Sequence, residues 1–150
     1  MSKISKNADT LRIRDIMPYG FEDTSFQAAG GVEGIARWIN TFFALIEALP
    51  EDNILLQSTT SEDRAKSKRR LNRFLSGWLG GPSKYNRSIY DLRIPAMNII
   101  HSMTMEEKDT WLSCMLKACT KQPYSSKFKH YLLAEIEGLA EQMYEAMQER

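Results

Sequence analysis

A chain of 150 residues is long enough to bury one substantial core and too short for two ordinary domains. Hydrophobic residues make up 43% of it and charged residues 26%, values typical of a soluble globular protein. Lysine and arginine number 20 against 19 aspartate and glutamate, so the overall charge indicates no polyanionic partner. No apolar run approaches the ~18 residues of a transmembrane helix, and the N-terminus lacks the apolar core of a secretion signal, so we expect a cytoplasmic protein.

Several segments have apolar residues every three or four positions, which is the period of an α-helix. Residues 1–25 read as a polar, mildly basic N-terminal extension, with a short helix expected before Pro18. Gly30 and Gly31 then open a helix with a broad apolar face, and Pro50 follows its end. The apolar positions of this helix are Ile35, Trp38, Ile39, Phe42, Phe43 and Ile46.

Three further helices are predicted from their ends and their apolar faces. Residues 61–63 (SED) suit a helix N-terminus, because a hydroxyl caps free amides and carboxylates favour the positive end of the dipole. That helix ends before Gly80. Thr104 and Glu107 have the spacing of a capping box, which opens the next helix. The last helix carries one apolar stripe, which can fill the chain's own core or form a homodimer: Phe128, Leu132, Ile136, Leu139, Met143 and Met147.

Cys114 and Cys119 are the only cysteines. Their spacing fits neither a C-x-x-C motif nor a zinc-ligand pattern. Residues five apart on one helix point in quite different directions, so we expect two buried or half-buried thiols and no internal disulfide.

The connection between Pro82 and Thr104 shows no regular period. It is longer than a helical bundle needs, and long connections of this kind are usually functional or disordered. The pattern alone therefore predicts an all-α domain of about four long helices with irregular connections.

Three stretches together resemble one protein family. Phe26–Gly31 (FQAAGG), Phe74–Pro82 (FLSGWLGGP) and Glu107–Met115 (EKDTWLSCM) are similar to segments of the group II truncated haemoglobins. In that family they are the opening of the fold, the end of the distal helix with its glycine turn, and the helix that bears a pocket tryptophan. The resemblance implies a two-over-two helical sandwich around haem, the truncated globin fold, over residues 26–150, preceded by the extension of residues 1–25.

The resemblance also implies roles for individual residues. Trp111 corresponds to the tryptophan that lies against bound ligand, and Ser67 and Leu71 correspond to distal-helix positions on the ligand side. Arg93 corresponds to a basic position near the haem propionates. Phe43 stands where the family usually has tyrosine, so it lacks the hydroxyl that would hydrogen-bond iron-bound oxygen.

Asn98 stands where the family has its iron-ligating proximal histidine. Haem iron in a globin needs a strong proximal donor, normally a neutral imidazole, and an asparagine amide oxygen is a poor donor to iron. Thr59 or Thr60 occupies a turn where the family usually has an aromatic or histidine residue near the porphyrin. Together with Phe43, these changes favour a degenerate, haem-free pocket with a binding or sensing role.

His101 supports the alternative of a working haem protein. It follows Asn98 by three residues, about one turn along the same helical face, at a position where the family has a pocket-facing phenylalanine. His101 is therefore either the iron ligand or a hydrogen-bonded core histidine, and Met97 is a further pocket candidate. Ligation by His101 would allow binding of O2 or NO and peroxidase or nitric oxide dioxygenase chemistry. A haem-free pocket would instead take a small apolar ligand, with no enzymatic activity expected.

The helix that carries Ser67 and Leu71 is crowded with basic side chains. Such a charge run is usually a solvated face, but it can also be a docking surface for an acidic protein, nucleic acid or membrane headgroups. The run contains no interleaved aromatic side chains that could stack on bases, which argues against specific binding of single-stranded nucleic acid. A third hypothesis is therefore an interaction module that retains only the fold. The basic residues are Arg64, Lys66, Lys68, Arg69, Arg70 and Arg73.

Overall fold

The computed structural model describes residues 18–50, 61–81 and 104–148 of the chain. Within these ranges the chain is all-helical, with no strand, and no helix there is long and apolar enough to cross a membrane. The helices are α2 (Thr24–Ala28), α3 (Gly31–Glu47), α4 (Ser61–Trp78), α5 (Met105–Thr120) and α6 (Ser126–Gln148).

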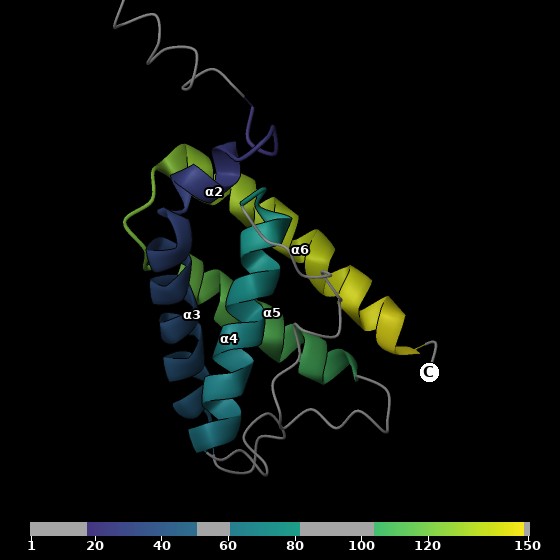
Figure 1. Cartoon of the computed structure of the whole chain (residues 1–150). Helices are drawn as coiled ribbons and strands as arrows, with labels where there is room; N and C mark the ends of the chain where they lie inside the picture. The colour runs from purple at the N-terminus through teal and green to yellow at the C-terminus, as the bar shows by residue number, and fades with distance from the viewer. Residues whose placement is uncertain (1–17, 51–60, 82–103, 149–150) are drawn as a thin grey trace, which may run out of the picture.

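The four long helices form two crossed layers. α3 and α4 lie side by side and run in opposite directions, and α5 and α6 cross behind them (Figure 1). α3 packs against both α4 and α5, α5 packs against α6, and the short α2 rests on the start of α3. This is the two-over-two helical sandwich that the family resemblance implies.

The helix ends follow from local chemistry. α3 begins directly after Gly30, whose φ of 91° is a left-handed conformation that glycine adopts without strain. At the start of α5, the Thr104 hydroxyl accepts a hydrogen bond from the Glu107 amide at 3.0 Å. The Glu107 carboxylate in turn accepts one from the Thr104 amide at 2.7 Å. These two bonds confirm the predicted capping box and fix the first turn of the helix.

The hydrophobic core lies between the two layers. α3 contributes its whole apolar face, and Trp38, Phe42 and Phe43 are among the largest side chains that are fully buried. Every residue of the predicted stripe on α6 is also buried within the chain. The stripe therefore packs in the chain's own core and is not left for a second copy.

The glycine turn at the end of α4 packs directly against α2. The Phe26 amide donates a hydrogen bond to the Leu79 carbonyl at 3.0 Å. A Cβ atom on Gly81 would overlap the Phe26 ring, and one on Gly80, at a φ of 91°, would overlap the Glu22 carbonyl. Only glycines allow this approach, so two of the motifs that carry the family resemblance meet at one contact.

Residues before α2 also touch the core. The Tyr19 ring lies 4.9 Å from the Phe128 ring and 5.1 Å from the Tyr131 ring, measured between centroids. The Gly20 amide donates a hydrogen bond to the Ser25 hydroxyl at 2.8 Å. α2 spans the predicted division of the chain at residue 25, and that division stays a prediction. The short helix expected before Pro18 lies outside the described residues.

Candidate functional site

Four of the predicted pocket residues lie in the described part of the chain, and all four are buried. Phe43 comes from α3, Ser67 and Leu71 from α4, and Trp111 from α5, and none is more than 2% exposed. The other predicted site residues lie outside the described ranges: Thr59, Thr60, Arg93, Met97, Asn98 and His101.

Aromatic rings from α3 and α5 meet in the interior. Phe42 and Phe43 contact each other edge to face, with centroids 5.2 Å apart and an interplanar angle of 85°. The Phe42 ring also lies 6.1 Å from the Trp111 ring. Such tilted arrangements are the favoured packing of aromatic pairs, so these contacts hold the rings in fixed orientations. We call these three residues, with Leu71 and Ser67, the interior cluster.

α4 contributes one aliphatic side chain, Leu71, and one hydroxyl side chain, Ser67, to the interior cluster. Ser67 and Leu71 are four residues apart, which places them one above the other on the same helical face. The Ser67 hydroxyl accepts a hydrogen bond from the Arg70 guanidinium at 3.2 Å. The Lys68 ammonium lies 5.7 Å from the centroid of the Phe43 ring, within the range of a cation–π contact. Phe43 therefore has apolar and cationic neighbours and brings no hydroxyl of its own.

The interior cluster includes no strong ligand for haem iron. His130, on α6, is exposed. Both cysteines are buried and free, which confirms that there is no internal disulfide. Burial raises the pKa of both thiols, to about 11 for Cys119, so neither is a thiolate near neutral pH.

Within the described ranges, moreover, no group of three or more histidine, cysteine, aspartate or glutamate side chains could hold a metal ion. These residues are mostly apolar and supply no ligand for iron. An iron ligand would have to come from elsewhere in the chain.

The predicted run of basic side chains on α4 divides into two parts. Arg64 Nε lies 2.9 Å from a Glu47 carboxylate oxygen, and Lys66 Nζ lies 3.7 Å from a Glu62 carboxylate oxygen. These two cations at the start of α4 are thus neutralised by acidic neighbours, and Arg70 is engaged with Ser67. The second part of the run consists of Lys68, Arg69 and Arg73.

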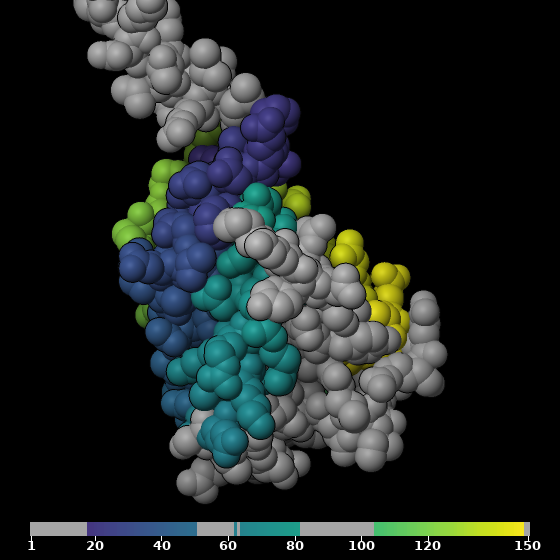
Figure 2. All heavy atoms as spheres, in the orientation of Figure 1, coloured from purple at the N-terminus to yellow at the C-terminus, as the bar shows by residue number. Residues whose placement is uncertain are grey.

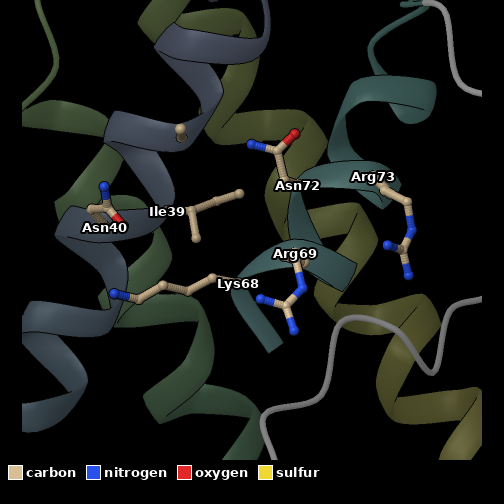
Figure 3. A pocket seen from close by; sticks show the side chains of 7 residues that line it. Ile39, Asn40, Lys68, Arg69, Asn72 and Arg73 are labelled. Carbon is tan, nitrogen blue, oxygen red and sulfur yellow. The ribbon is translucent and has the colours of Figure 1, made fainter. Parts of the chain in front are cut away.

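These three cations line a surface pocket between α3 and α4, the two helices that share one face of the molecule (Figure 2). Its volume is about 400 Å³. α3 contributes Ile39 and Asn40, and α4 contributes Lys68, Arg69, Asn72 and Arg73 (Figure 3). The two asparagines were not predicted as site residues, because only the packing of α3 against α4 brings them together. We call this the α3–α4 pocket.

Comparison with known proteins is consistent with this fold. The chain matches the family model described as bacterial-like globin over residues 24–145. It is 26% identical over 113 residues to the group 2 truncated haemoglobin YjbI of Bacillus subtilis (strain 168), a match that covers 75% of this chain and 83% of that protein.

Solved structures of group II truncated haemoglobins have a similar fold. The group II 2-on-2 haemoglobin from Agrobacterium tumefaciens has a TM-score of 0.62 at 24% identity, covering 79% of this chain and 92% of that one. The truncated oxygen-avid haemoglobin from B. subtilis has a TM-score of 0.58 at 25% identity, covering 79% and 97%. The chain belongs to the bacterial-like globin family, and its relatives are group II truncated haemoglobins.

Proposed function

We propose that this globin has a haem-free pocket that binds a small apolar ligand, in a binding or sensing role. The observation that carries the proposal is the environment of Phe43, which is 2% exposed and packed edge to face on Phe42. At a position where the family usually has tyrosine, this side chain offers no hydrogen bond to an iron-bound oxygen. Asn98, at the position that corresponds to the proximal histidine of the family, supports the same conclusion.

The chemistry of the interior cluster selects the ligand class. Aromatic and aliphatic side chains dominate it, and the Ser67 hydroxyl already accepts a hydrogen bond from Arg70. A polar ligand would find only the Ser67 hydroxyl in this cluster to replace its hydrogen bonds to water, whereas an apolar ligand gains about 25 cal/mol for each Å² that it buries. The related B. subtilis protein is described as oxygen-avid. We expect this chain to differ, because it lacks the tyrosine hydroxyl and the histidine.

A second function, oxygen or nitric oxide binding by a haem that His101 ligates, is favoured by one feature of the sequence. His101 follows Asn98 by three residues in the sequence, at a position that faces the pocket in the family. When bound, haem would supply the site for the diatomic ligand and any peroxidase or dioxygenase chemistry. Phe43, Leu71 and Trp111 would then form an apolar wall beside it.

Thermal unfolding with and without added ligands separates the two functions. A ligand that binds only the folded chain, present at about 100 times its Kd, stabilises it by ~2.7 kcal/mol, which is roughly 5–10 °C in Tm for this size. We expect benzene to raise the Tm and haem to leave it unchanged. No response to benzene would contradict an apolar ligand pocket.

The two histidines provide a matched pair of variants for the same assay. A rise in Tm with haem that is lost in His101→Ala and kept in His130→Ala would establish the second function in place of the first. His130 is the suitable control because it is exposed on α6.

A further inference from the structure

Glu107 is a buried carboxylate with one oxygen that lacks a hydrogen-bond partner. The residue is only 2% exposed. Its Oε1 atom accepts the hydrogen bond from the Thr104 amide that completes the capping box. Its Oε2 atom is buried and has no hydrogen-bond partner among the described residues. Burying a carboxylate oxygen without a partner is unfavourable, so we expect a donor from outside these residues to meet it.

The cation next to Glu107 in the sequence is directed elsewhere. Lys108 Nζ lies 2.6 Å from a Glu141 carboxylate oxygen and 3.8 Å from an Asp109 carboxylate oxygen. The same ammonium lies 5.6 Å from the centroid of the Tyr144 ring on α6. None of the ion pairs found in the described ranges includes Glu107. The unpaired oxygen is thus not neutralised by its neighbour on α5.

Glu107 lies on the face of α5 that carries Trp111. Glu107, Trp111 and Met115 are spaced by four residues, which places them in one row along the helix, and none is more than 2% exposed. The row faces α3, since the Trp111 ring lies 6.1 Å from the Phe42 ring. The Trp38 indole of α3 also donates a hydrogen bond to the Met115 carbonyl at 3.4 Å. A long side chain on a helix leans over the preceding turn, which for Trp111 is the turn of Glu107, so this carboxylate borders the interior cluster.

We propose that Glu107 Oε2 accepts a hydrogen bond from the ligand of this globin, and that the ligand is a small aromatic molecule with one N–H or O–H donor. The aromatic body suits the rings of Phe42, Phe43 and Trp111, and the donor satisfies the carboxylate oxygen. A ligand without a donor would leave Oε2 unpaired. This inference rests on the proposed apolar-ligand pocket and adds the single polar contact that orients the ligand and selects its class.

Thermal unfolding of the full-length chain with pyrrole and with furan tests the inference. The two rings are nearly equal in size and shape, and both are smaller than benzene, but pyrrole has an N–H donor where furan has an oxygen. The dependence of Tm on ligand concentration gives the Kd of each. We expect a Kd about tenfold lower for pyrrole, because only pyrrole can donate a hydrogen bond to the carboxylate.

Glu107→Gln replaces the free acceptor by a donor. Its amide oxygen can keep the bond from the Thr104 amide, and its amide nitrogen, in place of Oε2, can only donate. The preference for pyrrole over furan should therefore disappear. Glu106→Gln is the matched control, because it removes the same charge from the adjacent, exposed position on α5. This variant should keep the tenfold preference.

Equal Kd values for pyrrole and furan in the unchanged chain would overturn the inference and leave the apolar pocket standing. A preference that persists in Glu107→Gln would overturn it as well, as would a response to benzene without one to pyrrole. Lack of any response to pyrrole, furan and benzene would instead overturn the proposed pocket itself. The comparison of the two rings in the unchanged chain does not depend on the folding of any variant.

Discussion

Cys119 illustrates how burial sets the chemistry of a single side chain. It lies in the core on α5, and desolvation raises the pKa of its thiol from 9.0 to about 11. The folded chain therefore holds this proton at a pH where the unfolded chain releases it. The resulting stabilisation is fully present below pH 9 and is lost as the pH rises toward 11.

Two measurements follow from this shift. At pH 8 we expect both cysteines to react slowly with a thiol reagent in the folded chain and rapidly in guanidinium chloride. The urea midpoint should fall between pH 9 and 11, and less steeply in Cys119→Ala. The hydrogen bond to Glu141 raises the pKa of Lys108 above its ordinary value of 10.5. The stability of the folded chain therefore also falls as the pH rises above 10.5 and Lys108 loses its proton. Rapid reaction of Cys119 in the folded chain at pH 8 would contradict the account.

Sequence reasoning identified the buried residues of the interior cluster better than those of the α3–α4 pocket. Phe43 and Trp111 are apolar residues on helical faces, and the family resemblance supplied their expected place. Asn40 and Asn72 are common polar residues that stand far apart in the chain. Nothing in the local pattern links them, since their proximity depends on how two helices pack.

At the scale of elements, the turn after α4 depends on glycine. Gly80→Ala should lower the free energy of unfolding by about 2 kcal/mol or more, because alanine is strained at a φ of 91° and its Cβ would overlap the Glu22 carbonyl. Chemical denaturation monitored by circular dichroism measures the change.

Gly138→Ala is the matched control, since a Cβ at this position on α6 meets no atom within 4 Å. Alanine there should raise the stability by roughly 0.5–1 kcal/mol, because it favours the helix. If Gly80→Ala were as stable as the unchanged chain, the close approach of the turn to α2 would be wrong.

The long helices were predictable and the short one was not. α3 begins after the predicted glycines, and α4 begins at Ser61 and ends before Gly80, as predicted. The bonds between Thr104 and Glu107 confirm the capping box that opens α5. α2 has five residues, too few to show a helical period. The contact of Phe26 with the turn after α4 stabilises this short helix.

At the scale of the whole molecule, the apolar faces predict which side of each helix is buried but not which helices pair. The family resemblance supplied the two-over-two arrangement, and the structure confirms it. The same resemblance cannot assign the function, because the fold persists when individual pocket residues change. We propose that function here depends on the chemistry of Phe43, Asn98 and His101.

The absorbance spectrum of the protein purified from cells supplied with haem tests the central claim most directly. A haem-free globin should show no Soret band and only the ultraviolet absorbance of its own aromatic residues. Asn98→His restores the family's proximal residue and is the informative companion variant. If this variant has a Soret band and the unchanged protein has none, the absence of haem is due to Asn98. A strong Soret band in the unchanged protein, abolished by His101→Ala, would contradict the haem-free pocket.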